Sequence, residues 1–278
     1  MNTGELKELL HSEGIHPNKK LGQNFLVNRG MVQRIIDSCS LESTDRVLEI
    51  GPGAGALTGL LEEKAAHVTA VEIDAGLVRL LRKRFNDRKN LDIMHGDILK
   101  TGIPGDVNRV VGNLPYYCSS EILFRVAARE EVTMGCFMLQ KEMAQRMAAD
   151  PGESNYGALT VNLKLYFDVE YLFNIDRQSF FPQPDVTSTF VRLTRIKTGL
   201  NEEEKKLFHE LVRSAFWGRR KTIKKALSDS PHLDWSVDDV AQLLELAGYE
   251  ETARGETLET EDFMLLARAA WDMELKHG

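Results

Sequence analysis

The chain has 278 residues, of which 42% are hydrophobic and 28% charged, and its formal net charge is −7. This composition is typical of a soluble globular protein, and the length accommodates an α/β domain with a smaller second domain. No apolar run approaches the ~18 residues of a membrane span, and no signal segment opens the chain, so we expect a cytoplasmic protein without membrane association. Cys39, Cys118 and Cys136 are too few and too widely spaced to indicate a disulfide framework or a metal site.

The first part of the chain alternates predicted strands and helices. Apolar runs typical of strands lie at 46–50, 67–73, 91–95, 109–111 and 133–139. Helical periodicity lies at 5–13, 27–38, from the glycine turn 51–55 to about 65, and at 75–85, 119–128 and 141–149. This alternation predicts a mostly parallel sheet with helices on both faces.

The pattern changes after a turn-rich segment at 150–155. A predicted helix at 156–165 precedes two β-like runs, 167–175 and 187–195, which we interpret as an antiparallel pair at the edge of the sheet. The remaining pattern is helical only, at 202–216, 221–228, 237–246 and 261–276. We therefore predict two domains, a catalytic α/β domain at 1–198 and an all-α domain at 199–278.

The negative charge is concentrated at the end of the chain. Residues 228–278 contain 13 acidic and 3 basic residues, a net of −10, which leaves +3 for the rest. Segments 17–36 and 211–227 contain no acidic residue at all. Salt screens charges that are more than ~10 Å apart, so the acidic end of the chain does not cancel the local positive charge of these two segments. They are therefore candidate phosphate contacts. A solvated helix face would have the same composition.

A glycine-rich turn follows the first predicted strand of the sheet, in Glu49-Ile50-Gly51-Pro52-Gly53-Ala54-Gly55. Glycines such as Gly51 and Gly53 let a nucleotide-like ligand approach the backbone closely. Glu72, at the end of the next strand, can accept hydrogen bonds from ribose hydroxyls. Asp97 can accept from an adenine amino group or simply cap a helix. These residues fit either NAD or S-adenosylmethionine.

The tetrapeptide Asn113-Leu114-Pro115-Tyr116 follows the strand at 109–111. The Asn113 side-chain oxygen and the Leu114 carbonyl are two hydrogen-bond acceptors that can draw the N–H bonds of an aromatic amine out of the ring plane. Pro115 fixes the backbone turn, and Tyr116 offers a flat face to a base. Such a turn at the carboxyl end of a strand predicts an amine-methylating site, although an ordinary turn after a strand can have the same four residues by chance.

These motifs together resemble the ribosomal RNA adenine dimethyltransferases, specifically the KsgA type that acts on small-subunit RNA. The motifs are, in chain order, Lys19-Lys20-Leu21-Gly22-Gln23-Asn24-Phe25-Leu26, the glycine loop, Val71-Glu72-Ile73-Asp74, Gly96-Asp97, Asn113-Leu114-Pro115-Tyr116, Phe180-Phe181-Pro182-Gln183-Pro184-Asp185-Val186-Thr187-Ser188 and Phe216-Trp217-Gly218-Arg219-Arg220-Lys221-Thr222-Ile223. Each motif alone is weak evidence for the family. Their occurrence in the same order over nearly the whole chain is strong evidence for it.

The resemblance implies a Rossmann-like class I methyltransferase sheet with S-adenosylmethionine as methyl donor and no metal. It implies that the donor contacts are Asn24, Leu26, Gly51, Glu72, Asp97 and Asn113. It also implies that Tyr116 and Phe180 stack on the target base, and we expect the neighbouring Phe181 to fill the core instead. The expected RNA phosphate contacts are Lys19, Lys20, Arg219, Arg220 and Lys221.

The expected reaction is dimethylation of the N6 amine of two adjacent adenosines near the 3′ end of small-subunit ribosomal RNA. The expected partner is a precursor of the 30S particle, bound by a monomer. The alternatives are a macrolide-resistance methyltransferase acting on large-subunit RNA and an RNA-binding assembly factor whose methylation is incidental. A nicotinamide dehydrogenase is disfavoured because the sequence offers no convincing hydride-site His or Lys.

Three residues depart from the family pattern. Cys118 and Glu121 stand where the family usually has Ile and Pro, and Asp185 replaces a Lys. The loss of that lysine removes a potential phosphate contact, and the core residues of the site are unchanged.

Overall fold

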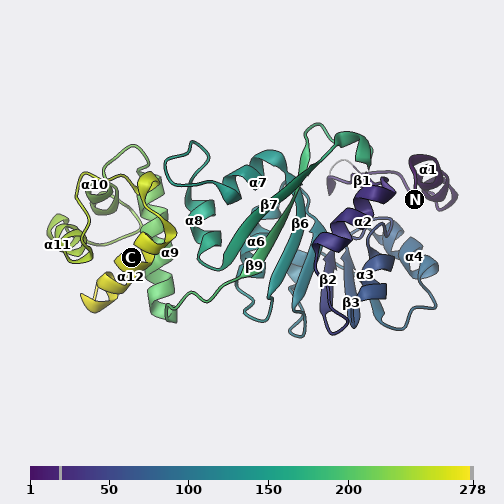
Figure 1. Cartoon of the computed structure of the whole chain (residues 1–278), viewed down its shortest axis with the longest axis horizontal. Helices are drawn as coiled ribbons and strands as arrows, with labels where there is room; N and C mark the ends of the chain where they lie inside the picture. The colour runs from purple at the N-terminus through teal and green to yellow at the C-terminus, as the bar shows by residue number, and fades with distance from the viewer. Residues whose placement is uncertain (19–20, 276–278) are drawn as a thin grey trace. The chain divides into compact units, whose positions relative to one another are not determined.

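The structure is a computed structural model that describes residues 1–18 and 21–275. Its contacts divide the chain into two compact units (Figure 1). The sheet unit consists of Met1–Ala144 and Asp168–Arg195, and the helical unit of Gln145–Phe167 and Ile196–Gly278. The break at residue 195 lies close to the predicted domain boundary at 198. The helical unit also takes in 145–167, because residues of this segment pack into the core of the C-terminal helices.

The sheet unit contains a mostly parallel sheet, as predicted from the alternating pattern. Within the described residues its strands are β2 (Arg46–Ile50), β3 (His67–Glu72), β4 (Leu91–His95), β5 (Arg109–Asn113), β6 (Met134–Gln140), β7 (Phe167–Ile175) and β9 (Ser188–Arg195). Their order in the sheet is β4-β3-β2-β5-β6-β9-β7. The order reverses beside β2, and such switch points are where open α/β sheets bind ligands at their carboxyl edge.

The antiparallel part of the sheet lies at its edge, where the two strands predicted there, β7 and β9, are neighbours. β9 runs antiparallel to β6, with Phe137 opposite Val191. It lies between β6 and the edge strand β7, so the antiparallel strand is the penultimate one in the sheet. The fold is Rossmann-like, as expected, with a mostly parallel sheet whose strand order reverses beside β2.

Helices connect the strands of the sheet unit. They are α1 (Thr3–Ser12), α2 (Arg29–Ser38), α3 (Thr58–Lys64), α4 (Ala75–Arg84), α5 (Ile98–Thr101), α6 (Ser119–Ala127) and α7 (Lys141–Ala148), the last of which crosses the break between the units. Local sequence explains where several begin. Asn28 caps α2 by accepting from Met31 N, and Asp74 caps α4 by accepting from Gly76 N and Leu77 N.

One face of the sheet packs against α2 and α3. Strand residues two apart, such as Val68 and Ala70, point to the same side of the sheet and are buried there. Ile35 and Ile36 of α2 and Leu61 of α3 are fully buried in the same cluster. This packing holds the carboxyl ends of β2, β3 and β5 in a fixed arrangement.

A two-stranded pairing that the sequence patterns do not predict joins two distant motifs. β1 (Phe25–Leu26) pairs antiparallel with β8 (Phe180–Phe181), and a short 3-10 turn (Arg177–Ser179) leads into β8. Two-residue strands are too short to leave a periodic pattern. The pairing brings the Gln-Asn-Phe-Leu and Phe-Phe-Pro segments side by side.

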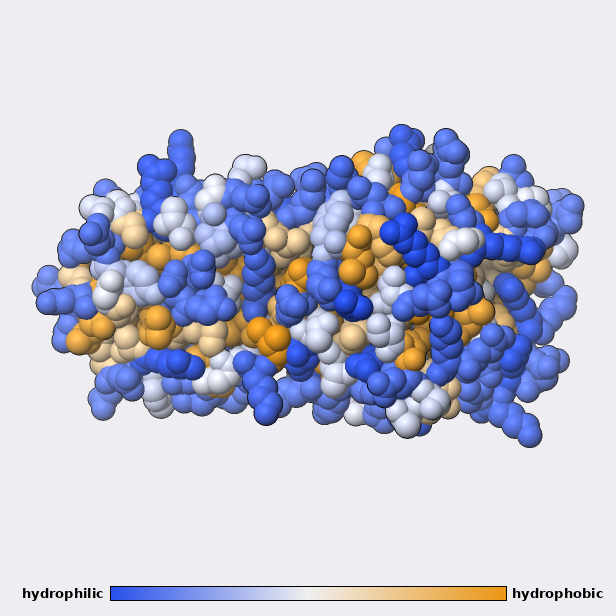
Figure 2. All heavy atoms as spheres, in the orientation of Figure 1, coloured by the Kyte–Doolittle hydropathy of each residue, from blue (hydrophilic) through white to orange (hydrophobic). Residues whose placement is uncertain are grey.

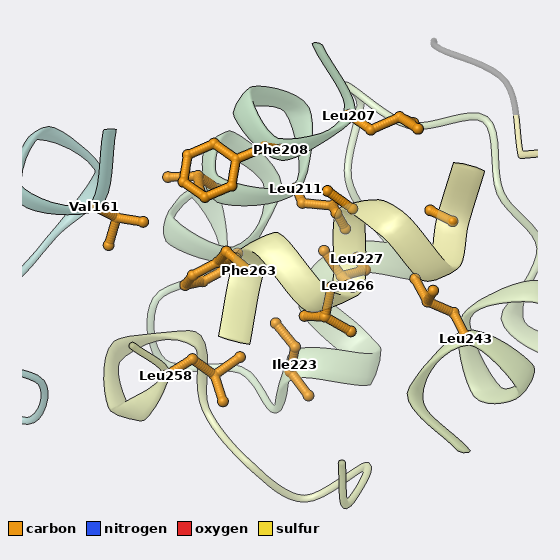
Figure 3. Close-up of a cluster of buried hydrophobic side chains, with 14 of the residues drawn as sticks. Val161, Leu207, Phe208, Leu211, Ile223, Leu227, Leu243, Leu258, Phe263 and Leu266 are labelled. Atoms are coloured by element: carbon orange, nitrogen blue, oxygen red, sulfur yellow. The ribbon is translucent and has the colours of Figure 1, made fainter. Parts of the chain in front are cut away.

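The helical unit has its own hydrophobic core (Figure 3). It is formed by α8 (Ala158–Lys164), α9 (Glu202–Trp217), α10 (Ile223–Ser228), α11 (Val237–Ala247) and α12 (Thr260–Asp272), with a 3-10 turn at Gly255–Thr257. Phe208 and Phe263 meet edge to face at its centre, with ring centroids 6.4 Å apart. Val161 of α8 belongs to the same cluster, which is why 145–167 is part of this unit.

No helix among the described residues is long and apolar enough to cross a membrane. On the face drawn in Figure 2, hydrophilic side chains predominate and hydrophobic ones form only small areas between them. All three cysteines are free and buried, and they act as small apolar core residues.

Candidate active site

The loops that follow β2, β3 and β5 lie side by side at the carboxyl edge of the sheet. Ile50 at the end of β2 is opposite Val71 in β3 and Gly112 in β5. The next residue along each of these strands therefore lies at the same edge of the sheet; these residues are Gly51, Glu72 and Asn113. The parallel register explains why residues far apart in the sequence meet there.

The glycine loop binds the carboxylate of Glu72. The backbone N–H of Gly53 donates to Glu72 Oε2 at 3.0 Å, and Asp74 N donates to Oε1 at 2.9 Å. Gly53 has a φ of +59°, which favours glycine. The Glu72 carboxylate is only 4% exposed, and burial is the main cause that raises its pKa above the ordinary value. These backbone groups do not use all the lone pairs of the carboxylate, so it can still accept from a bound hydroxyl.

Asn113 is oriented by the N-terminal segment. Its Nδ2 donates to the carbonyl of Asn24 at 3.0 Å, which leaves its Oδ1 atom as an acceptor. The N–H of Leu114 donates to Met138 O at 3.1 Å, and the Leu114 side chain is buried. The Leu114 carbonyl accepts no hydrogen bond from any residue within 1–18 or 21–275. Two acceptors that are free to bind an amine therefore stand next to each other in the chain.

Two neighbouring cavities meet at these residues. The first is lined by residues that include Leu26, Glu49 and Met138. The second is lined by residues that include Glu72, Ile73 and Tyr117. Both are lined by Asn24, Phe25, Gly51, Gly53 and Asn113. All the predicted donor contacts except Asp97 therefore line these two cavities.

Asp97 has the structural role that was the alternative to a ligand contact. Its carboxylate accepts from Leu99 N at 3.0 Å and caps α5. It is not among the residues that line the two cavities. The structure thus gives no cavity contact for Asp97.

Glu49 lines the first cavity and was not among the predicted site residues. It is 2% exposed, and its Oε2 atom has no hydrogen-bond partner among the described residues. Burial is the main cause that raises the pKa of Glu49 to about 8. The sequence signal was its position directly before the glycine loop, at the end of a buried strand.

The two phenylalanines of the Phe-Phe-Pro motif are exposed in the opposite order to the prediction. Phe180 is only 3% exposed and packs in the core with Leu26 and Phe190, whereas Phe181 is partly exposed with the Lys7 ammonium 4.9 Å from its ring centroid. Neighbouring residues of a strand point to opposite sides, and here the sheet core is on the Phe180 side. Phe180 therefore has no open face for a base in this structure, whereas Phe181 packs only partly buried against the cluster that includes Leu6 and Phe25.

The tyrosines of the turn are more accessible. Tyr116 is partly buried, and burial raises the pKa of its hydroxyl above the ordinary value, so it stays neutral. Tyr117 is 66% exposed and lines the second cavity.

Of the residues that depart from the family pattern, Cys118 is buried before α6, Glu121 pairs with Arg125, and Asp185 is exposed.

The predicted phosphate contacts of the helical unit are partly paired with acidic residues. Arg219 forms an ion pair with Glu256 at 2.9 Å, and Lys221 pairs with Asp229 at 2.9 Å. Arg220 is exposed. The acidic tail of the chain therefore neutralises part of the basic segment. Lys19 and Lys20 lie outside the described residues.

The family model for "Ribosomal RNA adenine dimethylase" matches residues 15–263 of this chain. A "Ribosomal RNA small subunit methyltransferase A" of Geobacter metallireducens is 39% identical over 271 residues, which cover 94% of this chain and 98% of that protein. A protein of the same name from Treponema denticola is 37% identical and covers 95% of this chain and 92% of its own length.

Two solved structures have the same architecture. A dimethyladenosine transferase from Plasmodium falciparum superposes with a TM-score of 0.82 at 29% identity, and covers 91% of this chain and 99% of its own. The 23S rRNA methyltransferase ErmE gives a TM-score of 0.73 at 28% identity, over 88% of this chain and 99% of its own. The chain belongs to the ribosomal RNA adenine dimethylase family, and the resemblance read from its motifs is confirmed.

Proposed function

We propose that this chain transfers methyl groups from S-adenosylmethionine to the N6 amine of two adjacent adenosines near the 3′ end of small-subunit ribosomal RNA. Membership of the adenine dimethylase family supports the base, and the names of the relatives support the small subunit. We further infer that it acts as a monomer in the cytoplasm, on a precursor of the 30S particle.

The observation that carries this proposal is the orientation of Asn113. The hydrogen bond from its Nδ2 to the Asn24 carbonyl directs its Oδ1 atom away from that contact, and the Leu114 carbonyl beside it accepts no hydrogen bond from the described residues. An exocyclic amine has two hydrogens, and two acceptors on neighbouring residues can accept one hydrogen bond from each. Holding them turns the nitrogen lone pair out of the ring plane, toward the carbon it attacks.

The residues around the two cavities fit S-adenosylmethionine. The Glu72 oxygens have lone pairs available for ribose hydroxyls, and the Gly53 loop presents backbone rather than side chain to the ligand. A Cβ on Gly53 would lie 3.0 Å from the Phe25 ring, so a larger residue would disturb this wall. When bound, S-adenosylmethionine supplies a methyl carbon activated by the adjacent sulfonium.

Tyr116 is the residue that we propose for stacking on the target base. Base–aromatic stacking contributes ~1 to 3 kcal/mol, enough to offset much of the cost of unstacking an adenosine. Its neutral hydroxyl keeps charge out of the ring. Phe180 is buried beneath the Phe25–Leu26 pairing, and we propose that it supports the wall of the site instead.

No strong base is needed for the transfer. Positive charge develops on the attacking nitrogen only in the transition state, so acceptors at Asn113 and Leu114 stabilise that state more than the ground state. The proton can then leave to water.

A large-subunit substrate has less support, because the 23S rRNA methyltransferase ErmE is less similar to this chain than the small-subunit relatives are.

The test is methyl transfer from a radiolabelled donor to small and large ribosomal subunits that lack the modification, with mapping of the labelled nucleotide. We expect label in adenosines of the small subunit only. Asn113→Ala should lower the transfer rate about 100-fold or more, with a much smaller change in donor affinity.

Asn86→Ala is the matched control, because Asn86 is exposed and lies outside both cavities. It should retain full activity. Label in the large subunit would contradict the proposed substrate. An Asn113→Ala variant as active as the control would contradict the proposed role of the asparagine.

A further inference from the structure

Trp217 is an exposed aromatic residue at the end of α9. Its side chain is 51% exposed, whereas Trp235 in the same unit is 6% exposed. An indole left open to water at a helix end contributes little to the core of the helical unit. A role in the folded core therefore does not explain its position.

A turn brings a cation over the Trp217 ring. The N–H of Lys221 donates to Gly218 O at 2.6 Å, and this turn reverses the chain after α9. The Lys221 ammonium then lies 4.6 Å from the centroid of the indole ring. A cation at this distance interacts favourably with one face of the ring, and about half of the side chain remains exposed to solvent.

The surroundings of Trp217 remain positively charged after the internal ion pairs are counted. Arg213 is four residues before Trp217, so both lie on the same face of α9. Arg213 and Arg220 are exposed, and no ion pair or hydrogen bond of either is found within residues 1–18 and 21–275. Two unpaired guanidinium groups therefore flank the exposed ring in the sequence.

An open aromatic face with flanking guanidinium groups matches the chemistry of a nucleotide in a single strand. The base stacks on the ring, and the phosphates on either side meet the cations. An acidic protein segment would satisfy the cations without requiring an open indole face. The combination favours nucleic acid.

We propose that Trp217 stacks on an unpaired base of RNA while Arg213 and Arg220 contact the adjacent phosphates. This contact lies in the helical unit, apart from the residues that line the donor cavities. It rests on the proposed function, in which RNA is the substrate. It adds a base contact to a segment whose expected role was phosphate contact alone.

The first test is equilibrium binding of the full chain to an unstructured oligoadenylate and to a double-stranded RNA. Trp217→Ala should weaken single-strand binding about fivefold or more, while Trp217→Phe retains most of the affinity. Trp271→Ala is the matched control, because Trp271 is also an exposed tryptophan of the helical unit, at 44%. It should bind like the wild type.

Salt dependence separates stacking from charge. Trp217→Ala should leave the slope of log affinity against log salt unchanged, whereas Arg213→Gln and Arg220→Gln should each reduce it by roughly 0.7. Fluorescence gives a direct readout of the ring. In a Trp271→Phe background, oligoadenylate should quench the emission of the exposed Trp217.

Unchanged affinity of Trp217→Ala for single strands, or an equal loss with Trp271→Ala, would overturn the inference, as would the absence of quenching. If Trp217 instead meets a protein, these RNA measurements will show no effect of the variant. Methyl transfer to small subunits is measured in parallel. If methyl transfer occurs but oligoadenylate does not quench the Trp217 emission, only the proposed stacking contact is contradicted. If quenching occurs without methyl transfer, only the proposed reaction is contradicted.

Discussion

The donor cavities of the sheet unit and the basic segment of the helical unit show two ways in which functional residues are placed. In the sheet unit, Gly51, Glu72 and Asn113 come together because each follows a parallel strand. In the helical unit, Arg219 and Lys221 are joined by acidic residues 37 and 8 positions away in the chain. Sheet topology fixes the first arrangement, whereas side-chain packing of the helices decides the second.

The comparison predicts that sheet-edge residues control donor binding strongly. Glu72→Gln keeps the shape of the side chain and removes its charge, so hydrogen bonds from ribose hydroxyls to it become weaker. We expect donor affinity to fall about 10-fold to 100-fold, since a hydrogen bond to a charged group contributes ~1.5 to 3 kcal/mol. Isothermal titration of the purified chain with the donor measures this.

Glu63→Gln serves as the control, because Glu63 is exposed on α3 and lines neither donor cavity. Its donor affinity should equal that of the wild type. Wild-type affinity in Glu72→Gln would mean that the buried carboxylate only organises the glycine loop.

Glu49 gives a pH-dependent test of the same edge. Its pKa is raised from 4.5 to about 8 in the folded chain, mainly by burial. The folded state therefore holds a proton that the unfolded state has lost between these pH values, and stability falls as pH rises through this window. Glu49→Gln removes the ionisation and should remove this loss.

Urea unfolding of the donor-free protein at pH 5, 7 and 9 measures the difference. The difference in the free energy of unfolding between Glu49→Gln and the wild type should increase by ~1 kcal/mol or more from pH 5 to pH 9, in favour of the variant. One pKa unit corresponds to ~1.4 kcal/mol. A difference that is the same at all three pH values would show that the Glu49 carboxyl has an ordinary pKa.

The smallest effects are expected where acidic residues pair with the basic segment. Glu251 pairs with Lys224 at 2.9 Å, and Glu256 pairs with Arg219. Replacing both acids by glutamine should strengthen RNA binding a few-fold and steepen its salt dependence, because two more cations become available to phosphates. Stability should change by less than ~1 kcal/mol, as is usual for surface ion pairs.

Filter binding to ribosomal RNA over a range of salt concentrations measures this effect. Glu261→Gln, which changes an acidic residue without an ion pair in the described part of the chain, controls for net charge. If it strengthens binding as much per charge as the paired acids do, the ion pairs themselves do not limit access to the basic segment.

The order of strands and helices was largely predictable because each element carries a local signal. The alternation at 46–139 indicated a parallel sheet, and the glycines after β2 marked the ligand edge. The pairing of Phe25–Leu26 with Phe180–Phe181 was not predictable from pattern, since two residues are too few for periodicity. The pair of strands at the sheet edge was predicted, but the patterns did not indicate which of the two, β9 or β7, lies next to β6.

The sequence by itself determined the family, the glycine loop and the Asn113–Tyr116 turn, because these depend on residue types in a fixed order along one strand and the turn after it. Only the tertiary structure decided which of Phe180 and Phe181 is buried, that one Glu49 oxygen has no hydrogen-bond partner among the described residues, and which cations form ion pairs. These properties depend on what packs against each side chain. The identity of the neighbours is set by long-range contacts that local sequence does not encode.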